Sequence, residues 1–158
     1  MGIADDFLRQ AGHLAIYQGV NATQSDLRRA VSTAYYALFH LLVEDCGHRW
    51  QGGSAASETG LQRALNHGQM NQSSQQFKGP QWRDWYGSLQ VVPPEIRRLA
   101  QAFIDLQEER QLADYANHVE WTVTQVQRIL LAQDSRTLPW LETTCHRCCW
   151  HGGLYTCD

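Results

Sequence analysis

The last residues of the chain gather side chains of the kind that bind metals. Cys145 and Cys148 are separated by two residues, which is a ligand spacing of zinc sites. With His151 and Cys157 they supply four thiolate and imidazole ligands, the number that zinc takes in a tetrahedral site. A zinc site is therefore one interpretation of this segment. The alternatives are a reactive tail or a segment unrelated to the fold, because the composition changes abruptly after Pro139.

Two further groups of polar side chains have the spacing of one helical turn. Tyr36 and His40 are four residues apart and share a helix face, with Arg29 a further two turns back. They could line a binding groove, or His40 could be a hydrogen-bonded core residue. Arg110 and Asp114 repeat the four-residue spacing, which is also the spacing of an ion pair on a helix surface.

Helices must position these side chains, because apolar residues recur at three- and four-residue steps along most of the chain. The expected helices cover residues 3–18, 25–46, 57–67, 93–113 and 117–130. Ser25 and Asn117 are the expected N-caps of the second and last. Residues 68–92 look loop-like, and strand signals are nearly absent. The sequence predicts an all-α, four- to five-helix up-and-down antiparallel bundle over residues 1–135, followed by a Cys-rich tail over residues 136–158.

Length and composition exclude several classes of protein. A chain of 158 residues that is 43% hydrophobic suits one domain and is too apolar for intrinsic disorder. A formal charge of −3 gives no bulk attraction to nucleic acid, although all bases except Lys78 are arginines, which bind phosphate well. No apolar run is long enough for a membrane span, and acidic residues near the start argue against a signal peptide, so a cytoplasmic protein is expected.

The helix expected over residues 25–46 is apolar on most sides. Such a helix is either central in its own domain or shared with a partner subunit. Cys46 ends this apolar run and is expected to be a small buried hydrophobic residue.

Three segments, in order, resemble the HEPN domain family (higher eukaryote and prokaryote nucleotide-binding). The first reads Asp26-Leu-Arg-Arg-Ala-Val-Ser-Thr-Ala-Tyr-Tyr-Ala-Leu-Phe-His40, and the last reads Glu109-Arg-Gln-Leu-Ala-Asp-Tyr115. Between them, Arg63-Ala-Leu-Asn-His67 is similar to a His-containing middle segment of many members. The resemblance extends over residues 3–132 and implies a helical bundle that dimerises.

Many members of that family are metal-independent ribonucleases, often the toxin of a toxin–antitoxin pair. Their motif is an arginine followed within one or two helical turns by a histidine. Here Arg110 stands at the arginine position, Asp114 and Tyr115 lie where the histidine is usual, and the first downstream histidine is His118. The resemblance implies that Arg110 holds a phosphate and that His118 or His40 is the general base, with no cofactor required.

The same resemblance suggests binding residues and partners. The expected binding residues are Arg29, Tyr36, Asp114 and Tyr115, and the expected partners are RNA, a second copy of the chain and a minimal nucleotidyltransferase antitoxin that could adenylylate Tyr115. The alternative is a non-catalytic HEPN interaction or nucleotide-binding module that partners such a nucleotidyltransferase. In that case Arg110 and Asp114 form only a structural pair, and Tyr115 packs into the core.

Overall fold

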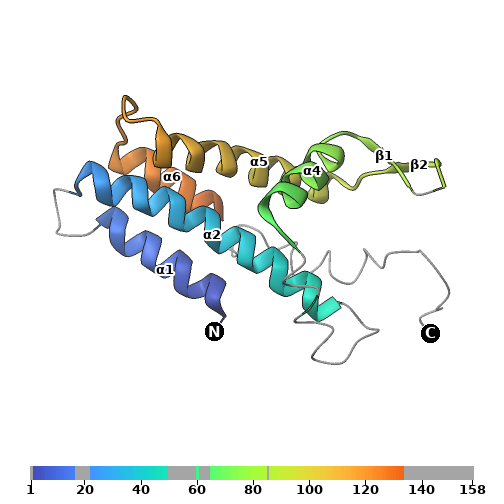
Figure 1. Cartoon of the computed structure of the whole chain (residues 1–158), viewed down its shortest axis with the longest axis horizontal. Coiled ribbons are helices and arrows are strands. Elements are labelled where there is room, and N and C mark those ends of the chain that lie inside the picture. Colours follow the sequence, from blue (N-terminus) through green and yellow to red (C-terminus); the bar gives the residue numbers. More distant parts are fainter. Residues whose placement is uncertain (1, 17–21, 50–59, 61–64, 85, 134–158) are drawn as a thin grey trace.

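The chain forms a helical bundle that carries one small β-hairpin (Figure 1). The computed structural model describes residues 2–16, 22–49, 60, 65–84 and 86–133. Within these residues the elements are α1 (Ile3–Ile16), α2 (Gln24–Arg49), α4 (His67–Phe77), β1 (Gln81–Arg83), β2 (Leu89–Val91), α5 (Pro94–Tyr115) and α6 (Val123–Gln133). The mostly helical fold that the sequence predicts is confirmed.

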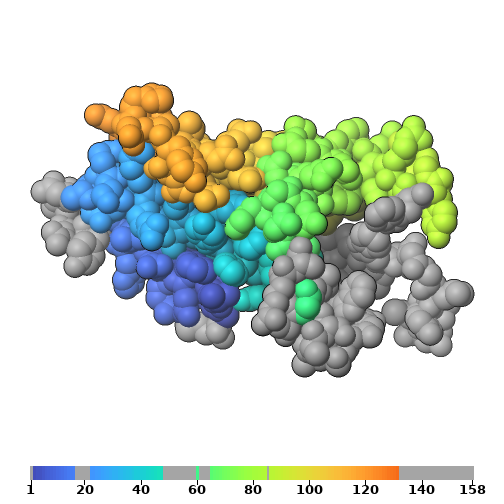
Figure 2. Space-filling view, viewed as in Figure 1, coloured from blue at the N-terminus to red at the C-terminus, as the bar shows by residue number. Residues whose placement is uncertain are grey.

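Helix α2 lies at the centre of the bundle. It contacts α1, α5 and α6, while α1 also contacts α6. Figure 1 shows α1 and α2 running in opposite directions, and likewise α5 and α6. Helix α4 and the hairpin lie at one end of the bundle, where they appear in green in Figure 2.

The core consists of two clusters along α2. One joins α2 to α1 and α6 through Ala15, Leu27, Ala30, Val31, Ala113, Trp121 and Val126. The other joins α2 to α5 through Tyr35, Leu38, Phe39, Val43, Phe103 and Leu106. Because α2 is covered by helices of its own chain, its apolar sequence no longer argues for a partner subunit.

One prediction about burial on α2 is wrong. Cys46 is exposed rather than buried. Figure 1 shows the last turns of α2 continuing past the start of α1, so α1 does not cover this part of the helix.

The N-caps of α2 and α6 differ from those expected. At α2, the Thr23 hydroxyl accepts a hydrogen bond from the Asp26 backbone N–H (3.2 Å), and the Asp26 carboxylate accepts from the Thr23 N–H (3.0 Å). The Thr23 hydroxyl also donates to the Asp26 carboxylate (2.7 Å), and this bond, followed by that from the Thr23 N–H, lowers the pKa of Asp26. Thr122 and Gln125 form the same reciprocal arrangement at α6. Both are capping boxes, so Thr23 and Thr122 replace the expected Ser25 and Asn117.

Arg28 fastens α2 to the end of α5 and to the loop that follows it. Its guanidinium donates hydrogen bonds to the backbone carbonyls of Ala113 (2.9 Å), Ala116 (3.0 Å) and Val119 (2.7 Å). Carbonyls at a helix C-terminus have no partners within the helix, and a cation is favourable there. The contact therefore fixes the C-terminal end of α5 against α2.

Replacing Arg28 with alanine is expected to lower the free energy of unfolding by about 2 kcal/mol, because three carbonyls lose a charged donor. The exposed neighbour Arg29 provides a matched control, and R29A is expected to stay within about 0.5 kcal/mol of wild type. Urea denaturation followed by circular dichroism measures both variants. Equal stability of the two variants would contradict this role of Arg28.

Helix α4 replaces part of the loop expected after residue 67. The Asn66 side chain caps it by accepting a hydrogen bond from the Gln69 backbone N–H (3.0 Å). The helix is polar, with Ser74 as its buried residue, so it lacks the apolar stripe by which helices are found in a sequence. The helix expected over residues 57–67 falls almost entirely outside the described residues.

The hairpin that follows α4 was also not predicted. Strands β1 and β2 pair antiparallel, with Trp82 opposite Gln90. The Asp84 carboxylate closes the turn by accepting from the backbone N–H groups of Tyr86 (2.9 Å) and Ser88 (2.8 Å), and Gly87 adopts a φ of 80° there. Strands of three residues are too short to show an alternating pattern.

Candidate functional site

Arg110 lies in the last two turns of α5 and is held in a partly buried position between α5 and α2. Its side chain is 19% exposed. The guanidinium carbon is 5.4 Å from the ring centroids of both Tyr35 and Tyr36, within the range of cation–π attraction. Nη2 also donates to the Tyr36 hydroxyl (3.4 Å). The bundle thus positions one cation against two aromatic rings of α2.

Asp114 lies one turn after Arg110 and binds it. Arg110 Nε donates to Asp114 Oδ2 at 2.9 Å. The other carboxylate oxygen accepts a hydrogen bond from the hydroxyl of Ser32, a buried residue of α2. The carboxylate therefore joins the cation on its own helix to a hydroxyl on the neighbouring helix.

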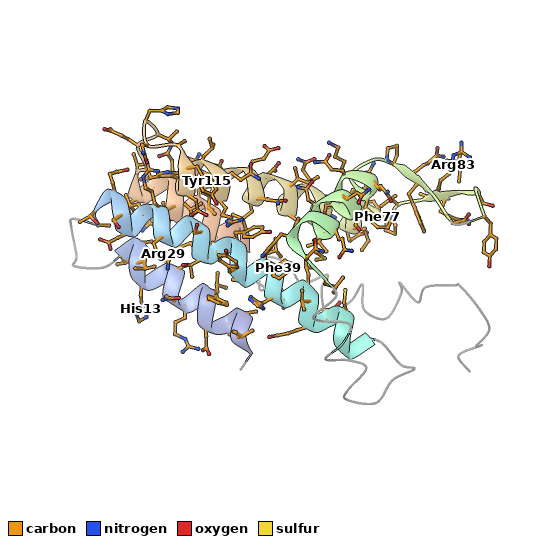
Figure 3. The ribbon with its side chains drawn as sticks, viewed as in Figure 1. His13, Arg29, Phe39, Phe77, Arg83 and Tyr115 are labelled. Atoms are coloured by element: carbon orange, nitrogen blue, oxygen red, sulfur yellow. The ribbon has the colours of Figure 1, made fainter. Side chains whose placement is uncertain are left out.

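His67, the first residue of α4, completes what we call the Arg110 cluster: Ser32, Tyr35, Tyr36, His67, Arg110 and Asp114. Its Nδ1 is 2.7 Å from the hydroxyl of the fully buried Tyr35. The imidazole packs on Phe39 with 4.0 Å between ring centroids and meets the Tyr36 ring edge-on at 5.7 Å. Figure 3 shows Phe39 on the part of α2 nearest the start of α4. Helices α2, α4 and α5 therefore all contribute to the cluster.

Burial sets the protonation states of Tyr35 and His67. Burial raises the pKa of Tyr35 to about 12, although the charge of Arg110 acts in the opposite direction, so the hydroxyl keeps its proton. Burial is also the largest cause that lowers the pKa of His67, followed by the charges of Arg110 and His40. His67 is consequently neutral near pH 7, the state in which an imidazole accepts a proton.

Folding stability is expected to fall as the pH drops below 6.5, the ordinary pKa of histidine. Below that pH the unfolded chain protonates His67 first, because the folded chain holds its pKa lower, so unfolding takes up a proton. The stability that the lowered pKa of His67 provides is fully present above pH 6.5. It is lost as the pH falls through the pKa that His67 has in the folded chain. We expect H67Q to show a smaller loss of melting temperature than wild type between about pH 7.5 and about pH 5.

The matched control for this prediction is His13→Gln, since His13 is exposed on α1 (Figure 3). H13Q is expected to keep the pH dependence of the wild type. An unchanged pH dependence in H67Q would contradict a lowered pKa of His67.

The structure brings several of the residues predicted from the sequence together. Tyr36 and Asp114 both bind Arg110 directly. His40 borders the cluster: its ring stacks on Phe7 at 5.2 Å, and its charge contributes to the lowered pKa of His67. Phe7 in turn lies 6.1 Å from the Tyr36 ring.

The other predicted residues occupy exposed positions in the described part of the chain. Arg29 is exposed on α2, and His118 is exposed on the loop between α5 and α6. Tyr115 ends α5 with 75% of its surface exposed, so the alternative that packs it into the core is wrong. Figure 3 labels Arg29 and Tyr115 on their two helices. Among the histidines whose side chains are described, His67 belongs to the cluster and His40 borders it.

Sequence reasoning missed the parts that Ser32, Tyr35 and His67 play. His67 was visible only as a member of a family-like segment, because its hydrogen-bond partner Tyr35 is 32 residues away. Ser32 and Asp114 are 82 residues apart. The one available signal was that Tyr36 has a second tyrosine directly before it.

The predicted zinc ligands Cys145, Cys148, His151 and Cys157 lie outside the described residues. In the part that the structure describes, no three His, Cys, Asp or Glu side chains gather so as to hold a metal ion. Of the helices described, none is both long enough and apolar enough to cross a membrane.

Comparison of the chain with models of protein families, with curated proteins and with solved structures gives no match.

Proposed function

We propose that the chain is a HEPN-like protein that binds RNA at the Arg110 cluster and cleaves it without a metal ion. The observation that carries this proposal is the presence of a cation and an imidazole in one cluster, where Arg110 and His67 both lie against the rings of Tyr35 and Tyr36. Metal-independent cleavage of RNA needs both groups: one to stabilise the charge on the phosphate and one to remove a proton. The sequence resemblance supports the same activity.

In the proposed reaction, Arg110 donates hydrogen bonds to non-bridging oxygens of the scissile phosphate. His67 removes the proton of the adjacent 2′-hydroxyl, whose oxygen then attacks phosphorus. The bond to the 5′ oxygen breaks, and that oxygen takes a proton from water. The products are a 2′,3′-cyclic phosphate and a 5′-hydroxyl, and the half-buried Tyr36 ring offers a surface on which a base can stack.

This assignment selects His67 as the base in preference to His118 and His40. His67 contacts two tyrosines and lies close enough to Arg110 for the charge of that arginine to lower its pKa. His40 is placed at the border of the cluster, and His118 is on an exposed loop.

The test is incubation of a mixed RNA pool with the wild type and with R110A in EDTA, followed by identification of the product ends. The proposal expects wild-type cleavage that leaves 2′,3′-cyclic phosphates, and a strong loss in R110A. No cleavage by a folded wild type, or equal cleavage by both proteins, would overturn it.

A non-catalytic HEPN interaction module, partnering a minimal nucleotidyltransferase, is the second candidate. The observation that favours it is the pairing of Arg110 with Asp114 and of Asp114 with Ser32, which ties α5 to α2. Under this candidate R110A chiefly loses stability, and urea denaturation of R110A distinguishes the two.

The remaining expectations about partners and cofactors rest on the sequence. A homodimer is proposed from the family resemblance, and light scattering on the purified chain tests it. Toxin–antitoxin context is a proposal of the same origin, and the cytoplasmic location expected from the sequence stays a proposal. Measurement of metal content after purification tests zinc in the tail.

A further inference from the structure

The guanidinium of Arg110 already holds an anion at the place where a phosphate would bind. A carboxylate oxygen of Asp114 accepts from Nε at 2.9 Å, and the Tyr36 hydroxyl lies 3.4 Å from Nη2. A phosphate uses the same donors of the guanidinium fork, in pairs of parallel hydrogen bonds. A phosphate and Asp114 therefore compete for this edge of Arg110.

We infer that Asp114 is a built-in competitor of the phosphate ligand, which RNA must displace from Arg110 in order to bind. The inference rests on the proposed function and adds a regulatory contact to the same site. While the pair is closed, the two opposite charges cancel, and an incoming phosphate meets little net attraction. Opening the pair exposes the full charge of Arg110.

Two observations distinguish this pair from an ordinary surface ion pair on a helix. The side chains of Arg110 and Asp114 are 19% and 27% exposed, whereas those of Arg98 and Glu95 on the same helix are 67% and 36% exposed, with 3.5 Å between their charged atoms. Water screens the second pair far more than the first.

The other observation is the contact with Ser32. Its hydroxyl donates to the oxygen of Asp114 that does not contact Nε. Ser32 is 2% exposed, so its position is fixed by the core of the bundle. The carboxylate is therefore held toward Arg110 from the neighbouring helix as well as from its own.

A competitor of this kind lowers the affinity for RNA, because RNA binds only during the fraction of time in which Asp114 does not occupy Arg110. Asp114→Asn removes the negative charge and keeps a side chain of the same shape, so the arginine is released. We expect D114N to bind RNA about tenfold more tightly than wild type. Ser32→Ala keeps the negative charge of Asp114 but removes the hydrogen bond from Ser32 that holds its carboxylate. The RNA affinity of S32A is expected to lie between those of wild type and D114N.

The experiment measures fluorescence anisotropy of a short labelled RNA of mixed sequence in which every 2′-hydroxyl is methylated, so that it binds without being cleaved. The proteins are wild type, D114N, S32A and R110A, with Glu95→Gln as the matched control for loss of an ion pair on α5. Melting temperatures establish that each variant is folded. The inference predicts tighter binding by D114N and S32A, and affinity equal to wild type for E95Q.

Two results would overturn the inference, and they differ in what they say about the proposed function. Equal or weaker binding by folded D114N, together with loss of binding in R110A, rejects the competitor and keeps the RNA site. Absence of RNA binding by both wild type and D114N rejects both proposals. If D114N fails to fold, S32A decides alone: unchanged affinity rejects the competitor.

Discussion

Replacing Arg110 with alanine is expected to lower the rate of RNA cleavage by about 100- to 1,000-fold, the usual cost of losing one fixed group that stabilises charge in a transition state. The effect is large because Arg110 is the cation that the Arg110 cluster places against the tyrosine rings and beside His67. Its side chain is only 19% exposed, so little water is available to take over its role. Single-turnover cleavage of a labelled RNA measures the effect.

The control for Arg110→Ala is Arg98→Ala. Arg98 lies on the same helix, pairs with an acidic residue and is 67% exposed. R98A is expected to cleave RNA at the rate of the wild type. A similar loss in both variants would mean that net charge, rather than the geometry of the Arg110 cluster, governs cleavage.

Arg110→Lys separates the charge from the shape of the side chain. Lysine keeps one positive charge but cannot present the flat guanidinium fork to a phosphate or lie flat against two rings. We expect R110K to recover only a small part of the activity that R110A loses. Full recovery would show that the phosphate needs a charge alone.

Replacing His67 with alanine is expected to lower the cleavage rate by about 100- to 10,000-fold, the range for a general base. The pKa of His67 is lowered, so in the wild type the rate should rise with pH below 6.5 and level off near neutrality. H67A should lose this rise together with most of the activity. A pH profile of single-turnover rates measures both effects.

Two comparisons make the His67 prediction specific. H13A is expected to match wild type, because His13 is exposed on α1, a helix that contributes no residue to the Arg110 cluster. His118→Ala tests the first histidine after Arg110, one of the two bases that the family resemblance implies. A loss of activity in H118A with a normal rate in H67A would return the role of base to His118.

The sequence was sufficient to predict those helices that bury an apolar stripe. Helix α5 begins at Pro94 and carries Phe103 and Leu106 into the core, as the three- and four-residue spacing predicts. Helix α4 was missed because it is polar and buries little, although Asn66 caps its start. The caps at Thr23 and Thr122 were missed because each needs a partner three residues away, in addition to a suitable residue at the cap.

The candidate site was predictable only as far as one helix extends. The spacing of Arg110 and Asp114 predicts their contact, because both residues lie on α5. The contacts of Tyr35 with His67 and of Ser32 with Asp114 join different helices. Such contacts depend on the rotation of each helix about its axis, which the order of residues along the chain does not specify.

The most direct test of the proposed catalytic pair is a comparison of single-turnover cleavage in EDTA by wild type, R110A, H67A and the double variant R110A/H67A. We expect Arg110 and His67 to act in one step, so the double variant should be little slower than either single variant. Independent losses that multiply in the double variant, or a folded wild type that leaves RNA intact, would contradict it.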